Sequence, residues 1–345
     1  MNKLNSSKYT VIGGGLLIGS LIVSLVLFVS RIDQVDINNI RLMHQQRLTK
    51  QERNIAKFAS DHLASIYASK PASEDLEEVK WTAHKYAVSL SESAPQELYE
   101  SGRAVVLTAT TESMPDLLIY IQWLRMREAD IPIEVYLPDW SHYEPDLCAD
   151  MLPGLDIECR VLTDIYGEYL LRNSDYKPST KYLAMLASKY DDVVYYEPFS
   201  LPLSSPHSVL GADAFNNTGL VLLGTGEQAR FEAGDIDVET CDPSQIFLSK
   251  SSHLSTLLLA AYYEMWSLSY NVPSAAAKIL ANDFRFAENK ENAFVLDDKV
   301  IAWHPGALSF EPGRHFGKLV DIERLLNTDV DIEFILCDIA RHLAF

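Results

Sequence analysis

The pattern of apolar positions predicts an alternation of strands and helices from about residue 102 onward. Two short runs, Ala104–Leu107 and Ile133–Leu137, flank a stretch near 115–127 in which apolar residues recur three and four positions apart. That recurrence is typical of a helix that packs one face on a core, and short β-branched runs are typical of buried strands. We therefore expect βαβ units and a mostly parallel sheet flanked by helices, which is the α/β class.

The stretch Tyr176–Pro206 is the centre of this pattern. It reads as a helix, a turn, a strand at Val193–Tyr196 that is apolar on both faces, and an abrupt loop. Glu197 follows the strand directly, and Pro198 prevents further regular pairing. Ligands of open α/β sheets bind outside the carboxyl ends of the strands, so Glu197 is a candidate site residue.

Two other apolar runs end in polar residues that are candidates for the same edge of the sheet. Thr108 follows the first strand, and His304 follows a late strand at Val300–Trp303. A carboxylate and a histidine at adjacent strand ends have the ligand types that hold a divalent ion beside a phosphate. The alternative is that Glu197 is a solvated loop residue and that His304 has a structural role. The residues by themselves leave both interpretations open.

Further elements are expected on both sides of this centre. Residues 31–100 are polar with two apolar stripes, which predicts a stem with one or two helices packing on a main domain at 101–345. Within the main domain the same reasoning predicts a helix near Pro145–Leu152, strands at Cys159–Leu162 and Gly219–Leu223, and helices at Leu254–Met265, Ser274–Phe286 and Leu319–Phe345.

The amino-terminal region has the pattern of a membrane anchor. Tyr9–Ser30 contains 22 residues without a charge, and as a helix this run would be about 33 Å long, enough to cross a bilayer. The run is longer than the apolar part of a cleaved signal peptide and leads directly into Arg31. We therefore predict a tail at 1–8 and an uncleaved anchor at 9–30. Basic residues lie on both sides of the anchor, so the charges do not decide its orientation.

Composition and cysteine content narrow the functional classes. The net charge of −19 argues against a nucleic-acid partner, because no basic stripe is present to bind phosphates. None of the common sequence motifs of serine hydrolases, zinc proteases or nucleotide-binding loops is present in the main domain. The four cysteines lack zinc-binding spacing. Cys148 and Cys159 form either a disulfide or two unpaired buried thiols, and the spacing alone favours neither.

Blocks of sequence between residues 100 and 306 resemble, in order, those of the fungal Golgi α-mannosyltransferases that build mannan and glycoprotein outer chains. No single block is decisive, but their order along the chain makes the resemblance specific. The blocks are GRAVVLTATTESMPDLLIYIQWLRMREADIPIEVYLPD, CADMLPGLDIECRVLTD, KYLAMLASKYDDVVYYEPFSLPLSSP, NNTGLVLL, LSKSSHLSTLLLAAYYEMW, the weaker AENKENAFVL, and VIAWHPG.

The resemblance implies a fold, a location and a reaction. It implies a type II Golgi membrane protein with a cytosolic tail, a lumenal domain and a GT-A-like fold, which transfers mannose from GDP-mannose to a mannosylated glycan acceptor with Mn²⁺ as cofactor. It also implies a disulfide between Cys148 and Cys159. The same resemblance implies that Thr108, Lys181 and Glu197 bind the donor. It also implies that Glu197 and His304 bind the metal.

The chain departs from the family pattern at the residues that matter most for the metal. Where the family has Asp-x-Asp after the buried strand, this chain has Glu197-Pro198-Phe199, and a later family aspartate is Asn289. Losing a cation beside a leaving diphosphate costs several kcal/mol of barrier, and about 3 kcal/mol is roughly a hundredfold in rate. Two functions follow. One is a mannosyltransferase with an altered metal site, in which either Glu197 and His304 hold a weakly bound ion or Lys181 partly replaces the cation. The other is an inactive paralogue that acts as a membrane-anchored partner or scaffold of active mannosyltransferases.

Overall fold

The computed structural model describes residues 40–42 and 48–303, with gaps at 69–75, 96, 115–116, 118–119, 122–123, 126–129, 168–179, 198–200, 203, 232–235, 266–271 and 291–292. The chain divides into two compact units at Leu48/Thr49, and the elements that carry the fold belong to the second unit. The predicted anchor at 9–30, His304 and the predicted helix at Leu319–Phe345 lie outside the described residues. Among the helices that are described, none is long and apolar enough to cross a membrane.

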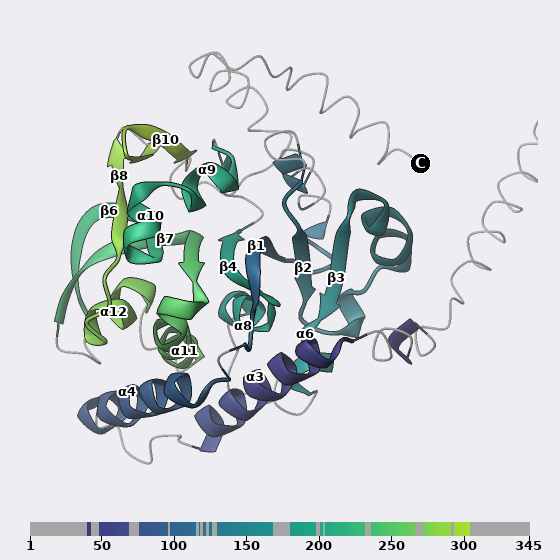
Figure 1. The fold of residues 1–345 in the computed structure, drawn as a ribbon, viewed down its shortest axis with the longest axis horizontal. Coiled ribbons are helices and arrows are strands. Elements are labelled where there is room, and N and C mark those ends of the chain that lie inside the picture. The colour runs from purple at the N-terminus through teal and green to yellow at the C-terminus, as the bar shows by residue number, and fades with distance from the viewer. Residues whose placement is uncertain are drawn as a thin grey trace, which may run out of the picture. The chain divides into compact units, whose positions relative to one another are not determined.

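The described strands form one ten-stranded sheet in the order β3-β2-β1-β4-β7-β6-β8-β9-β10-β5 (Figure 1). In chain order the strands are β1 (Glu100–Thr108), β2 (Ile133–Leu137), β3 (Ile157–Val161), β4 (Tyr190–Tyr196), β5 (Leu201–Pro202), β6 (Leu220–Phe231), β7 (Ile236–Ser249), β8 (Arg285–Lys290), β9 (Ala293–Leu296) and β10 (Lys299–Trp303).

The sheet is mixed, so the prediction of a mostly parallel sheet was wrong beyond β4. β3, β2, β1 and β4 pair in parallel, as do β6 and β8. β7 pairs antiparallel with both β4 and β6, and β8, β9, β10 and β5 continue the antiparallel pattern. The physical reason is the length of the connections. Parallel neighbours need a crossover of a dozen or more residues, whereas only residues 232–235 separate β6 from β7.

Strand β7, which lies between β4 and β6, was not predicted from the sequence. Its apolar alternation is broken near its middle by the segment Asp242–Gln245. The pairing with β6 shifts at this point, because Leu222 is opposite Ile246 while the next residue of β6 is opposite Asp242. A bulge of this kind accommodates Pro243, which cannot donate a ladder hydrogen bond.

Helices cover one face of the sheet and share a single apolar core with it. The opposite face of β4 is covered differently: Tyr196 packs against Tyr120, which belongs to the predicted helix at 115–127, at a ring-centroid distance of 5.8 Å. The helices that share the core are α3 (Lys50–Ala68), α4 (Leu76–Ser93), α6 (Leu162–Tyr166), α8 (Thr180–Ala187), α11 (Lys250–Met265) and α12 (Val272–Ile279).

Two predicted helices differ from the structure. The helix expected at Ser274–Phe286 ends at Ile279, because Ala281 adopts a left-handed conformation (φ 55°), and Phe286 belongs to strand β8 instead. The helix expected near Pro145–Leu152 is a wide π-helical turn at Asp146–Met151 followed by a 3₁₀ turn. A disulfide between Cys148 and Cys159 joins this irregular segment to β3.

A buried cluster of charges attaches helix α3 to the edge of the sheet. The guanidinium of Arg160 on β3 lies 2.6 Å from Glu52 of α3, 2.9 Å from Glu158 and 3.5 Å from Glu134. Burial acts to raise the pKa of Glu52, but the charge of Arg160 and hydrogen bonds from Thr49 and Arg160 outweigh it, so the pKa is lowered. The cluster therefore holds a charged carboxylate of α3 against β3.

His62 attaches the same helix to α11. Its ring is fully buried and forms a hydrogen bond with the backbone of Leu258. Burial lowers the pKa of His62 from 6.5 to about 3, and the hydrogen bond opposes that change only in part. The folded protein therefore requires a neutral imidazole between α3 and α11, because a buried charge without an anion is costly.

We predict that His62 makes the folded state less stable as the pH falls below about 6.5. The unfolded state binds the proton near pH 6.5 while the folded state resists it down to about pH 3, so the stabilisation is complete above 6.5 and is lost as the pH falls. The expected loss is on the order of 1 kcal/mol per pH unit. Urea denaturation between pH 7 and pH 5 measures it. His62→Gln should flatten the slope, whereas the same change at exposed His207 should leave it unaltered.

Candidate functional site

The carboxyl ends of β1 and β4 lie side by side and place two of the predicted site residues close together. The two strands pair in parallel up to Leu107 opposite Tyr196. Thr108 ends β1, and Glu197 directly follows β4. The backbone N–H of Glu197 donates to the carbonyl of Ser244 at 2.8 Å, which ties the residue to the bulged part of β7.

The third predicted residue, Lys181, reaches the same edge from helix α8. Its Nζ lies 2.7 Å from Oε1 of Glu197 and donates a second hydrogen bond, at 3.3 Å, to the carbonyl of Pro243 in β7. The ammonium also lies 5.5 Å from the ring centroid of Tyr195. The side chain of Lys181 is 11% exposed and that of Glu197 is 38% exposed, so the ion pair has a buried cation and a carboxylate that faces solvent.

Tyr195, which the sequence predicted only as a strand residue, connects these residues to β1. Its hydroxyl and Oγ1 of Thr108 form a hydrogen bond at 2.9 Å. Burial, and next the charge of Glu197, raise the pKa of Tyr195 well above its usual value, so its phenol stays protonated. The available signal was the alternation of the strand: a residue two positions before Glu197 must lie on the same face of the sheet.

The ammonium of Lys181 has one N–H left with which to hydrogen-bond a ligand. A lysine ammonium has three N–H donors, and the contacts with Glu197 and Pro243 account for two of them. A third N–H at the carboxyl edge of a sheet is suited to a phosphate oxygen, because a charge-assisted hydrogen bond is stronger than a neutral one. The three predicted residues are thus brought together around Tyr195 in a form that suits an anionic ligand.

A second buried lysine, Lys250, has contacts that indicate a structural role. Nζ of Lys250 donates to the carbonyl of Ser188 at 2.6 Å and lies 3.6 Å from the ring centroid of Tyr99. The contact is at the carboxyl end of helix α8, where a cation is stabilised by the unpaired carbonyls. Lys250 lies at the amino ends of β1 and β4, away from the candidate site, and these contacts account for its burial.

The described residues do not fit the Mn²⁺ that the resemblance implies. A divalent cation of this kind needs several oxygen or nitrogen ligands. Glu197 offers one carboxylate, and its partner is the ammonium of Lys181. Within the part of the chain that the structure describes, no group of three or more His, Cys, Asp or Glu side chains is placed to hold a metal. The implied contribution of His304 stays a prediction, because His304 lies outside that part.

Residues 102–224 match the family model described as "Mannosyltransferase putative". The chain is 26% identical over 263 residues to the α-1,2-mannosyltransferase MNN21 of Candida albicans, an alignment that covers 59% of this chain and 39% of the relative. It is 22% identical over 204 residues to MNN2 of the same organism, covering 45% of this chain and 34% of the relative. Over these residues the chain is similar to the fungal mannosyltransferases. The resemblance seen in the sequence is thereby confirmed.

The chain spans between a third and two fifths of the length of these curated relatives. Among solved structures, it has a TM-score of 0.38 and 10% identity to the galactosyltransferase LgtC in complex with donor and acceptor sugar analogues, covering 55% of this chain and 74% of that one. It has a TM-score of 0.37 and 11% identity to the glycosyltransferase GlyE of Streptococcus pneumoniae, covering 55% and 46%.

We predict that Lys181 and Glu197 stabilise the fold jointly. In a double-mutant cycle of Lys181→Met and Glu197→Gln, urea denaturation should give a coupling energy of about 1 kcal/mol or somewhat more, since the cation is buried but the carboxylate is partly solvated. The matched control is the pair Arg230–Asp237, whose side chains are 59% and 71% exposed and whose coupling should be near zero. Equal couplings for the two pairs would contradict the ion pair.

Proposed function

We propose that this family member is a mannosyltransferase with a GT-A-like fold, which moves a mannosyl group from GDP-mannose to a mannose residue of a glycoprotein or cell-wall glycan. The observation that carries the proposal is the placement of the buried Lys181 ammonium at the carboxyl edge of β1 and β4, beside Thr108 and Tyr195. Similarity to mannosyltransferases supports the class of reaction, and the edge of the sheet is where α/β proteins bind ligands.

Each residue has a part in this proposal that follows from its contacts. When the bond between the sugar and the diphosphate breaks, negative charge grows on the diphosphate, and a cation held in place lowers the barrier. Lys181 supplies that cation, while Glu197 and the carbonyl of Pro243 orient it. Thr108 at the end of β1 is partly exposed and is hydrogen-bonded by the buried Tyr195, so its hydroxyl is the one placed to contact the donor.

The proposal includes a Golgi membrane location with the described unit in the lumen. The uncharged run at 9–30 supports a membrane anchor. The disulfide between Cys148 and Cys159 supports a lumenal position, because disulfides persist in the oxidising secretory compartments and are rare in the cytosol.

The second candidate function is that of an inactive paralogue, anchored in the membrane, that binds active mannosyltransferases. Two observations favour it. The carboxylate of Glu197 is already neutralised by Lys181, and Asn289 stands on β8 where the family has an aspartate. An amide has no charge with which to hold a cation or to accept a proton. The two candidates differ in turnover and in donor binding, and both quantities are measurable.

We predict that the full-length chain binds GDP through Lys181. Titration calorimetry should give a dissociation constant that rises about tenfold or more in Lys181→Met, since the variant loses a charge-assisted hydrogen bond to phosphate. The matched control is Lys57→Met, a lysine exposed on α3, which should leave the constant unchanged. The release of GDP from GDP-mannose in the presence of α-mannobiose, with and without Mn²⁺, measures turnover.

The outcomes separate the two candidates. GDP binding with turnover supports the transferase. GDP binding without turnover in the presence of acceptor and Mn²⁺ supports the inactive paralogue. A chain that is folded and does not bind GDP at millimolar concentration would contradict the donor site, and with it the proposed function.

A further inference from the structure

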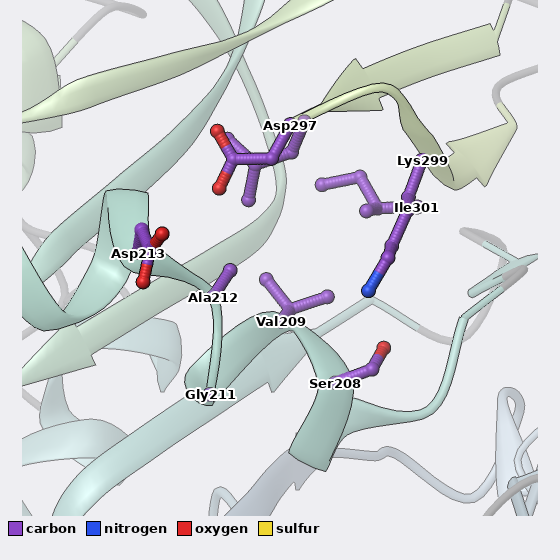
Figure 2. Close-up of a pocket in the computed structure, with 9 residues that line it drawn as sticks. Ser208, Val209, Gly211, Ala212, Asp213, Asp297, Lys299 and Ile301 are labelled. Atoms are coloured by element: carbon purple, nitrogen blue, oxygen red, sulfur yellow. The ribbon is translucent and has the colours of Figure 1, made fainter.

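A small cavity lies between the β9–β10 hairpin and the helices α9 (Pro206–Leu210) and α10 (Asp213–Thr218). We call it the hairpin pocket. It has a volume of about 240 Å³ and is lined by Ser208, Val209, Gly211, Ala212, Asp213, Leu296, Asp297, Lys299 and Ile301. Figure 2 shows the side chains of Asp213, Asp297 and Lys299 around the pocket, with Val209 and Ile301 between them.

The walls of the pocket are held in place by the turn of the hairpin. Asp297 and Asp298 form the two-residue turn, and both have positive φ, 48° and 62°, as a tight hairpin turn requires. Oδ2 of Asp297 accepts a hydrogen bond from the backbone N–H of Ala214 at 3.3 Å. This bond fastens the tip of the hairpin to α10, so the two sides of the pocket have a defined separation.

The polar groups of the pocket are available to a ligand. The side chains of Asp213 and Lys299 are exposed and make no hydrogen bond or ion pair with any other residue that the structure describes. Asp297 uses one carboxylate oxygen for Ala214, which leaves the other oxygen for a ligand. The pocket thus combines two carboxylates and one ammonium with the apolar side chains of Val209, Leu296 and Ile301.

This combination matches a sugar ring better than it matches a nucleotide. A hexose has hydroxyls that donate to carboxylates and accept from an ammonium, and it has C–H faces that pack on apolar side chains. Two carboxylates repel a diphosphate, and the volume of 240 Å³ is below the roughly 300 Å³ at which pockets for drug-sized ligands begin. A single sugar ring is therefore the class of ligand that fits.

The pocket adjoins a second cavity and is linked to the candidate site by paired strands. A cavity of about 450 Å³ is lined in part by the same Asp213, Leu296 and Asp297, so the two cavities adjoin. On the other side, β5 follows the loop after Glu197 and pairs with β10, the strand that supplies Lys299 and Ile301. The Ser204 hydroxyl reinforces this link by donating to the Val300 carbonyl at 2.7 Å.

We propose that the hairpin pocket binds one mannose residue of the acceptor glycan, with Asp213 and Asp297 accepting hydrogen bonds from its hydroxyls and Lys299 donating one. The identity of the sugar rests on the proposed function, whereas the pocket and its preference for a neutral polyhydroxyl ligand do not. The neighbouring cavity receives the next residue of the glycan. The donor and acceptor sites are thus connected through the paired strands β5 and β10.

The test is the binding of methyl α-mannopyranoside to the full-length chain, followed by ligand-observed NMR, with GDP binding measured in parallel. Asp213→Asn and Asp297→Asn should each weaken mannoside binding about tenfold and leave the GDP dissociation constant unchanged. Asparagine tolerates positive φ and keeps an oxygen for the N–H of Ala214, so the turn should survive. The control is Asp150→Asn, an exposed acid near β3 at the far edge of the sheet, which should change neither constant.

The outcomes distinguish the pocket from the proposed function. Mannoside binding that is unchanged in the double variant of Asp213 and Asp297 would overturn the proposal, as would a wild-type chain that binds GDP but no mannoside at 100-fold molar excess or more. Mannoside binding that depends on both aspartates in a chain that does not bind GDP would support the pocket while the proposed transferase function fails.

Discussion

The candidate site depends on the pairing of one buried ammonium with one carboxylate at the end of β4. Taking the ammonium of Lys181 out of water costs several kcal/mol, and nearby acceptors must offset that cost. Glu197 and the carbonyl of Pro243 do so at 2.7 and 3.3 Å. Helix α8 is buried from Lys181 to Ala187, which holds the backbone of the lysine beside the strand. The positive charge of Lys181 is therefore neutralised by a side chain of the protein itself, Glu197.

That pairing also explains why an irregular strand lies at the centre of the sheet. β7 runs antiparallel to β4, and its bulge turns the carbonyl of Pro243 toward Lys181 and that of Ser244 toward the N–H of Glu197. A regular parallel strand in this position would carry its carbonyls along the ladder instead. Strand β5 begins at Leu201, soon after Glu197, and pairs with β10, so this pairing joins the lysine site to the hairpin pocket.

Many of the strands and helices could be predicted from the sequence, because the spacing of apolar residues depends on local secondary structure. The runs Ala104–Leu107, Ile133–Leu137 and Val193–Tyr196 lie within β1, β2 and β4, and the stripe at Leu254–Met265 lies within α11. These segments are largely buried, so the spacing of their apolar residues follows the side-chain period of the strand or helix that they form. Thr108, Lys181 and Glu197 were found because strand ends are readable in the sequence and because the family resemblance drew attention to the lysine helix.

The tertiary structure alone decided which of these segments meet. The placement of β7, the change from parallel to antiparallel pairing, the contact of Tyr195 with Thr108 and the approach of Asp297 to Ala214 all join residues far apart in the chain. No local period encodes such contacts, because they follow from how the whole core packs. The sequence by itself thus determined most of the strands and helices and the similarity to fungal mannosyltransferases. Only the folded chain determined that a buried lysine would meet Glu197 and that two aspartates would share one pocket, because burial and charge pairing are properties of the assembled core.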